Sequence, residues 1–288
     1  MANAADLPLN ERGAVYHLDL LSEEIADTII TVGDPARVNQ VSRHFDSIEL
    51  KRQHREFVTH TGYLNNQRLT VLSTGIGMPN IDIVINELDA LASMDLPSRT
   101  YLDNGRQLSL IRLGTTGSIH ENFAIGDIIN SAYAIGLDNM MDFYQYSMTN
   151  DEKLLHQNCQ KTFTDYTSAY FVAQAESSLH QQFKNDAKPG ITITCNGFYA
   201  AQGRALRHPL AFPNLYRDLS TLSFQDIPVT NIEMETAALY GLSRLMGHRC
   251  VSLSVVLANR IKGEFADAIE PLVERMIKHA LIEITENL

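Results

Sequence analysis

The feature that most constrains this fold is an alternation of short, β-branched apolar runs with stretches whose apolar residues recur at helical spacing. Short runs of this kind are typical of buried strands. Helical spacing is clearest near the C-terminus, where an unbroken apolar stripe runs from Ile269 to Ile284, with Pro271 in the first turn. The pattern predicts an α/β fold with a parallel or mixed sheet. We expect strands at 28–32, 69–73, 108–113, 127–132, 191–195 and 250–257, and helices at 81–91, 167–184, 234–246 and 269–284.

The chain has 288 residues, of which 44% are hydrophobic, which is ample material for a large buried core. No linker rich in Pro, Gly or Ser and no run of like charge divides it, so we expect a single domain over residues 1–288.

A net charge of −11 without a basic tract argues against a nucleic-acid partner or an anionic membrane surface. The N-terminal residues lack an apolar signal core, and no apolar run approaches membrane-spanning length. The three cysteines are widely spaced and form no metal-ligand motif, and His54 and His60 have no partner cluster. We therefore expect a cytoplasmic protein without a metal site.

Ligands of open α/β sheets bind beyond the carboxyl ends of strands, so the loops after the strands are where chemistry is expected. The first strand is followed by Gly33, Asp34 and Pro35, which predict a helix start with Asp34 as N-cap. Arg37 is not explained by capping. It is either a solvated surface charge or, with the amides of the helix start, part of an oxyanion site.

Two further loops are rich in glycine. The loop from Gly75 to Gly77 resembles a dinucleotide-binding turn only weakly, because the third glycine is missing, and a tight strand-to-helix crossover explains it better. Arg112 lies inside an apolar strand, where burial requires a counter-ion, and a hydroxyl-rich segment follows it at once. It either binds a phosphate or pairs with a structural carboxylate.

Glu233 and Glu235 lie at the start of a predicted helix among apolar neighbours. The helix dipole alone could account for both carboxylates. In a half-buried setting, a carboxylate is also suited to accept two hydrogen bonds from adjacent sugar hydroxyls.

Taken together, these segments resemble the nucleoside phosphorylase superfamily, of the uridine phosphorylase type. The resemblance runs from about Tyr16 to Arg260 and implies a three-layer α/β/α fold with a central mixed, partly barrel-like sheet flanked by helices. Seven segments carry it in order, namely 15–18 (VYHL), 33–38 (GDPARV), 54–57 (HREF), 73–77 (STGIG), 112–117 (RLGTTG), 198–204 (FYAAQGR) and 233–236 (EMET).

The resemblance implies roles for individual residues. Arg55 and His17 would reach the phosphate and the ribose 5′-hydroxyl of a neighbouring subunit's site, so a homo-oligomer with a dimeric active unit, dimer or hexamer, is expected. The phosphate site of one subunit would comprise Gly33, Arg37, Arg112 and Thr115. The ribose would meet Met234 and Glu235, and the base would meet Phe198, Gln202 and Arg204.

The implied reaction is phosphorolysis of uridine to ribose 1-phosphate and uracil, in pyrimidine salvage, with inorganic phosphate as co-substrate and no cofactor. A glutamine amide can accept and donate across two adjacent positions of uracil, and an arginine can donate to a carbonyl. Purine-specific relatives usually carry an aspartate after the last core strand, whereas here that strand ends at Asn259 and Arg260 without an acid.

Three other functions fit the same segments: a purine nucleoside phosphorylase, a hydrolytic nucleosidase on the same fold, or a non-catalytic nucleoside-binding protein. Glu56 and Ile76 occupy positions that border a monovalent cation in some relatives. Asn80 stands where those relatives carry serine, which argues against the ion here. Two insertions, near 93–106 and 140–188, depart from the simplest pattern of the family.

Overall fold

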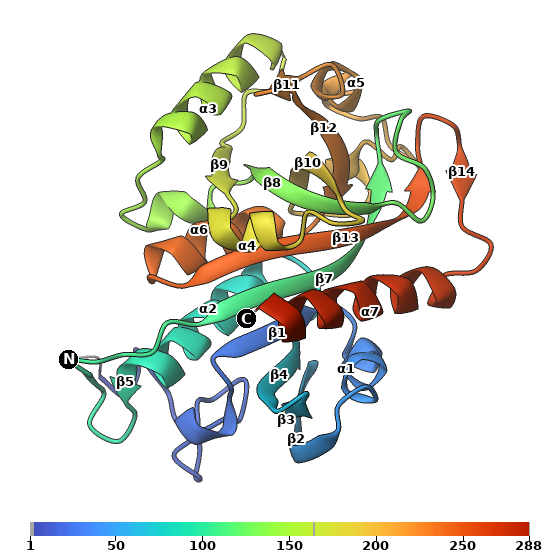
Figure 1. Cartoon of the computed structure of the whole chain (residues 1–288). Helices are drawn as coiled ribbons and strands as arrows, with labels where there is room; N and C mark the ends of the chain where they lie inside the picture. Colours follow the sequence, from blue (N-terminus) through green and yellow to red (C-terminus); the bar gives the residue numbers. More distant parts are fainter. Residues whose placement is uncertain (1–2, 164, 288) are drawn as a thin grey trace.

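The computed structural model describes residues 3–163 and 165–287 and is built around one continuous mixed sheet (Figure 1). Its strand order is β11-β12-β10-β8-β13-β7-β1-β4-β3-β2, with β9 added to β8 and β14 to β13. The strands in chain order are β1 (Thr28–Val32), β2 (Ser47–His54), β3 (Phe57–Leu64), β4 (Gln67–Ser73), β7 (Ser109–Ser118), β8 (Ile128–Leu137), β9 (Phe171–Gln174), β10 (Lys188–Cys195), β11 (Ser223–Phe224), β12 (Ile227–Glu233), β13 (Arg249–Asn259) and β14 (Glu264–Phe265). A separate two-stranded ribbon comprises β5 (Met94–Asp95) and β6 (Thr100–Tyr101).

Five strands of the sheet close into a barrel. The ring runs β7-β13-β8-β10-β12, and β12 returns to β7 through the antiparallel pairs Asn231 with Ser118 and Ile232 with Gly117. The β13–β7, β10–β8 and β10–β12 pairs are parallel, whereas β13–β8 is antiparallel. This ring confirms the expected mixed, partly barrel-like sheet.

Helices cover both faces of the sheet, which confirms the three layers. Ile29 and Ile30 of β1 are both fully buried but lie in different cores, because successive side chains of a strand point to opposite faces. The helices are α1 (Pro35–Ser42), α2 (Met78–Ser93), α3 (Asn150–Thr162), α4 (Ser177–Gln182), α5 (Leu215–Leu219), α6 (Thr236–Leu245) and α7 (Glu270–Asn287), with 3-10 turns η1 (Ser22–Glu24), η2 (Met140–Phe143) and η3 (Ala200–Gln202). Ile29 belongs to the core that includes α2 and α6, and Ile30 belongs to the core that includes α1 and α7.

The predicted helix at 167–184 is wrong. Its apolar segment Phe171–Gln174 forms β9, which pairs antiparallel with β8, and only Ser177–Gln182 is helical. The open edge of β8 offered a hydrogen-bonding partner that periodicity within the segment does not reveal, so tertiary pairing overrode local preference.

The segment after Arg112 is also not a loop. Residues through Ser118 continue β7 and pair with β13, so the predicted strand end at residue 113 is wrong. The Gly-Thr run is thereby part of a regular strand, and its end at Gly117 and Ser118 pairs with β12 where the barrel closes.

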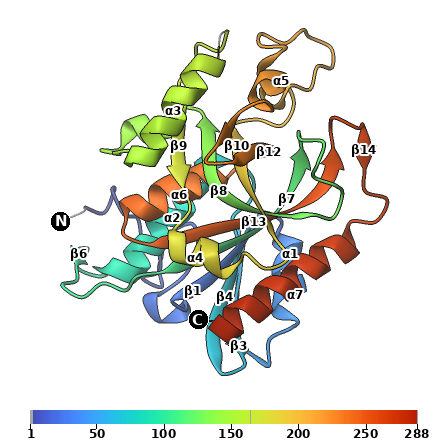
Figure 2. The same cartoon turned by 45° about the horizontal axis from the view of Figure 1, so that its top comes forward.

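The insertion near 140–188 contributes η2, α3, β9 and α4. Figure 2 shows α3 and α5 next to each other, and both share a core with β10, in which Leu155, Leu219 and Ile193 are fully buried. Among the described residues, no helix is long and apolar enough to cross a membrane.

Candidate functional site

A cavity of about 680 Å³ opens where the loops after β1 and β4 meet the upper part of β7 and the end of β12. It gathers segments that lie far apart in the sequence. The predicted site residues that line it are Gly33, Arg37, Glu56, Ile76, Arg112, Thr115, Phe198, Gln202, Arg204, Met234 and Glu235.

The helix that follows β1 begins as predicted. The Asp34 side chain caps α1 by accepting the Ala36 N–H at 2.9 Å, with Pro35 as the first helical residue. One turn in, the Arg37 guanidinium bends toward β7 and donates from Nη1 to the Leu113 carbonyl at 3.2 Å. Burial and the nearby positive charge of Arg112 both lower the pKa of Arg37. Two cations held this close favour an anion between them.

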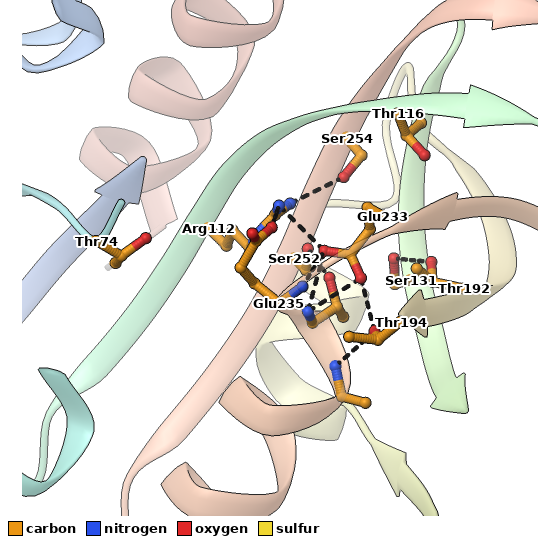
Figure 3. A network of polar contacts seen from close by, with 12 residues as sticks. Thr74, Arg112, Thr116, Ser131, Thr192, Thr194, Glu233, Glu235, Ser252 and Ser254 are labelled. Carbon is orange, nitrogen blue, oxygen red and sulfur yellow. Dashed lines mark hydrogen bonds and ion pairs between the residues drawn. The ribbon is translucent and has the colours of Figure 1, made fainter. Parts of the chain in front are cut away.

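Arg112 is both a buried ion-pair partner and a wall of the cavity, so the two interpretations of this residue are not exclusive. Its side chain is 7% exposed, and Nη2 lies 2.5 Å from Glu235 Oε2 and 3.0 Å from Glu233 Oε2, while Nη1 donates to Ser254 Oγ at 3.2 Å (Figure 3). A guanidinium carries five N–H donors, so these three contacts do not use all of them.

Gly114 makes room for that guanidinium. A Cβ built on Gly114 would overlap Arg112 Nη1 and lie 2.6 Å from its Cζ. Only glycine therefore fits at this position of β7 while Arg112 keeps its place beside the two carboxylates.

The two carboxylates have different partners. Glu233 accepts the backbone N–H groups of Glu235 and Thr236 at 3.0 Å and the Thr194 hydroxyl at 2.6 Å, so it holds the start of α6 in place. Of the two roles that the sequence left open for Glu233, these contacts are those of a helix start. Glu235 accepts the Gly77 N–H at 2.7 Å, so α2 and α6 both begin at the cavity wall.

Burial raises the pKa of Glu235, while the charge of Arg112 acts in the opposite direction. Each oxygen of this carboxylate accepts one protein hydrogen bond, from Gly77 or from Arg112. A carboxylate oxygen offers two acceptor positions, so Glu235 can still accept hydrogen bonds from ligand hydroxyls.

The third group of predicted residues comes from the segment after β10. Arg204 lies over the Phe198 ring, 3.9 Å from its centroid, and donates to the side-chain carbonyl of Gln202 at 2.5 Å. Gln202 is 3% exposed. The turn closes at Gly203, whose φ of 68° and close approach to the Tyr216 ring exclude a larger residue.

Sequence reasoning missed two neighbours of this group. Arg260 donates to the Gln202 backbone carbonyl at 2.5 Å and lies 5.7 Å from the Tyr216 ring centroid. Phe265 on β14 lines the cavity although 66% of its surface is exposed. Neither belongs to a recognisable motif, and only the pairing of β14 with β13 brings Phe265 to the cavity.

His17 and Arg55 do not line this cavity. Both flank the Tyr16 ring, which is 5.1 Å from the His17 ring and 5.6 Å from the Arg55 guanidinium carbon. His54 donates from Nδ1 to the His17 carbonyl at 3.0 Å. Arg55 and Glu56 form the exposed β2–β3 turn, in which Arg55 has a φ of 55° and Glu56 lines the cavity.

At the expected position of a monovalent cation, the Asn80 side-chain amide donates to Glu56 Oε1 at 3.3 Å. Ile76 is 70% exposed at the cavity mouth. Within residues 3–163 and 165–287, no group of three or more His, Cys, Asp or Glu side chains is arranged to hold a metal ion.

The comparisons with known proteins agree with this geometry. The family model of the phosphorylase superfamily matches residues 27–284. A uridine phosphorylase of Thermococcus kodakarensis is 32% identical over 93% of this chain and 85% of its own length. A solved nucleoside phosphorylase of Trypanosoma brucei, described as showing uridine phosphorylase activity, superposes with a TM-score of 0.87 at 29% identity, covering 96% of this chain and 99% of that one. A DeoD-type purine nucleoside phosphorylase of Listeria welshimeri is 26% identical over 88% of this chain and 91% of its own length.

A barrel-closed mixed sheet with an arginine-lined cavity at its strand ends defines a protein of the phosphorylase superfamily, and this chain belongs to that family. It is a nucleoside phosphorylase, an enzyme of the pentosyltransferase type. Both uridine and purine enzymes occur among its relatives, so the family alone leaves the base open.

Proposed function

We propose that this chain is a uridine phosphorylase, converting uridine and inorganic phosphate to ribose 1-phosphate and uracil in cytoplasmic pyrimidine salvage. The observation that carries the proposal is a single cavity lined by Arg37 and Arg112 together with Gln202 and Arg204. Anion-binding groups and a glutamine–arginine pair suited to the uracil edge thus share one space, which phosphorolysis of a pyrimidine nucleoside requires.

The phosphate would lie against Arg37, Arg112, Thr115 and the backbone at Gly33. Positioning and charge supply the acceleration: the phosphate oxygen approaches C1′ as the bond from C1′ to N1 of uracil breaks, and positive charge develops on the sugar. Binding the dianion also relieves the repulsion that lowers the pKa of Arg37.

The ribose would contact Met234 and Glu235, with the 2′- and 3′-hydroxyls donating to the carboxylate. The base would lie near Phe198, with Gln202 and Arg204 stabilising the electron pair that uracil carries away at O2 and O4 before it is protonated. Inorganic phosphate is the co-substrate, and the proposed reaction uses no organic cofactor.

The environment of Asn259 supports a pyrimidine. Its amide nitrogen donates to the carbonyls of Phe123 and His120, and its carbonyl accepts the N–H groups of Ile261 and Lys262. The residue is fully buried, so the position after the last core strand supplies neither an acid nor a free amide for N7 of a purine.

We further propose that the active unit is a dimer, within a dimer or a hexamer, in which His17 and Arg55 complete the partner's site. Both residues flank Tyr16, and neither lines the cavity of its own chain. Mixing inactive Arg55→Ala protein with inactive Arg112→Ala protein should restore activity, because some hybrid sites then contain both native residues. No recovery, with hybrid oligomers shown to form, would exclude shared sites.

The base and the reaction type are tested by one panel: uridine, thymidine and inosine, each with and without phosphate, monitored by base release. We expect uracil release from uridine only when phosphate is present, together with ribose 1-phosphate. Release without phosphate would identify a hydrolase, and preference for inosine would identify a purine enzyme.

A further inference from the structure

Glu87 is a carboxylate on the buried face of α2, and none of its contacts involves the cavity. It is 6% exposed and accepts three different donors from the N-terminal segment. Its Oε1 lies 2.6 Å from His17 Nδ1 and 3.0 Å from the His17 backbone nitrogen, and its Oε2 accepts the Leu18 N–H at 2.8 Å.

A buried carboxylate is costly unless hydrogen bonds satisfy it, so these contacts define one arrangement of the segment rather than a loose association. The bond to Nδ1 orients the imidazole ring, and the bonds to the two backbone amides fix the position of the backbone that carries it. His54 adds a fourth constraint by donating to the His17 carbonyl at 3.0 Å.

One nitrogen of the His17 imidazole is hydrogen-bonded within the chain, and the other is available to a ligand. Nδ1 is committed to Glu87, which leaves Nε2 as the nitrogen available to a ligand. The side chain remains 26% exposed, so part of the ring is accessible from outside the chain.

The position of Glu87 explains why His17 does not serve its own cavity. Gly77, whose N–H binds Glu235, precedes the first residue of α2, and Glu87 lies ten residues further along the chain. At 1.5 Å per residue, Glu87 lies roughly 15 Å along α2 from that end. One helix thus supports Glu235 of its own cavity at its start and His17 in its second half.

We propose that Glu87 is a positioning residue that places His17 for the 5′-hydroxyl of a nucleoside bound to a second copy of the chain. The inference rests on the proposed function and assigns to Glu87 no contact with substrate. Its role is to fix where Nε2 lies, because a hydroxyl both donates and accepts and pairs with either tautomer of the ring.

The test compares uridine with 5′-deoxyuridine, which lacks only the group that His17 would bind. The quantity measured is kcat/KM for uridine divided by kcat/KM for 5′-deoxyuridine, in the full oligomeric enzyme. Loss of one such hydrogen bond should lower that ratio about tenfold in His17→Ala. Glu87→Ala should lower it by a similar factor, and the double variant should lower it no further.

Two matched variants separate positioning from other effects. Glu87→Gln can still accept the two backbone amides through oxygen and donate to Nδ1 through nitrogen, so the ratio should stay within about threefold of the wild type. Asn86→Ala changes the exposed neighbour on the same helix and should leave the ratio unchanged.

The outcomes separate the proposed role of Glu87 from the proposed role of His17. If the ratio falls in His17→Ala but not in Glu87→Ala, or if both substrates lose activity equally in Glu87→Ala, Glu87 is only structural and the inference is overturned. A Glu87→Gln ratio as low as that of Glu87→Ala would show that charge, not placement, is what Glu87 supplies, and would also overturn it. An unchanged ratio in His17→Ala would refute the proposed role of His17 itself.

Discussion

Removal of the Arg112 side chain is the perturbation whose consequences the structure defines best. Arg112→Ala deletes the guanidinium that lies between Glu233 and Glu235, and both carboxylates are buried, with 4% and 6% of their surface exposed. The same deletion removes a cation from the cavity wall. We therefore expect a loss of stability and a loss of activity, each with its own physical cause.

The stability loss follows from the unpaired charges. Removing one partner of a buried ion pair costs about 3–5 kcal/mol, because the remaining charge keeps its desolvation penalty. At the 2–4 °C per kcal/mol typical of domains of about 150–250 residues, the expected fall in Tm is roughly 6–20 °C. The activity loss should be at least about 10²-fold, the effect of deleting one preorganised charge donor.

Thermal unfolding and uracil release measure the two effects separately. The double variant Arg112→Ala/Glu235→Gln removes one of the stranded charges, so it should recover part of the lost stability while activity stays low. Near-normal phosphorolysis by Arg112→Ala would refute its role at the phosphate. An unchanged Tm would refute the view that its guanidinium is needed to keep the carboxylates buried.

Three further outcomes are expected. Gly114→Ala should displace the Arg112 guanidinium from its place and raise the KM for phosphate about tenfold or more, whereas unchanged phosphate kinetics would contradict the packing argument. Gly203→Ala should raise the KM for uridine more than the KM for phosphate, since it moves the turn that presents Gln202 against Tyr216; equal effects on both would count against a base-binding role. The third outcome concerns Glu176, whose pKa burial tends to raise. Hydrogen bonds from the start of α4 outweigh burial and lower the pKa of Glu176 from its usual value near 4.5 to about 2. The ionised Glu176 carboxylate therefore stabilises the folded state fully above pH 4.5, and this stabilisation is lost as the pH falls toward 2. The unfolding free energy of Glu176→Gln should decline less steeply with acid than that of the wild type, and identical slopes would refute this.

Much of the fold could be predicted because periodic patterns are local. The strand at 28–32 has the predicted bounds, and the predicted helix at 81–91 lies within α2. The predicted helix at 269–284 matches α7 from residue 270 on, one residue after its predicted start. The start of α1 was predictable from capping chemistry alone, since Asp34 and Pro35 determine it without any distant contact.

Features set by distant pairing could not be predicted. Phe171–Gln174 forms a strand because β8 offers a free edge, and the Gly-Thr run after Arg112 is extended because β13 and β12 flank it. The local sequence of neither segment indicates which strands it will pair with. Closure of the barrel is likewise a property of the pairing and not of any one strand.

The cavity itself was predictable as a set of loops but not as a network of contacts. A buried Arg112 required a counter-ion, yet nothing in the sequence indicated that two carboxylates would share it. The contact between His17 and Glu87 joins residues seventy positions apart, so it too required the fold. The division into one domain and the role of each site residue stay predictions.

The central claim is that one cavity binds phosphate and uracil together, and a crystal structure of the enzyme with phosphate and uracil bound tests it most directly. We expect the phosphate on Arg37 and Arg112 and the uracil edge on Gln202 and Arg204, with His17 and Arg55 of a neighbouring subunit closing the same site. Phosphate and uracil in separate cavities, or a phosphate that contacts neither arginine, would contradict the account.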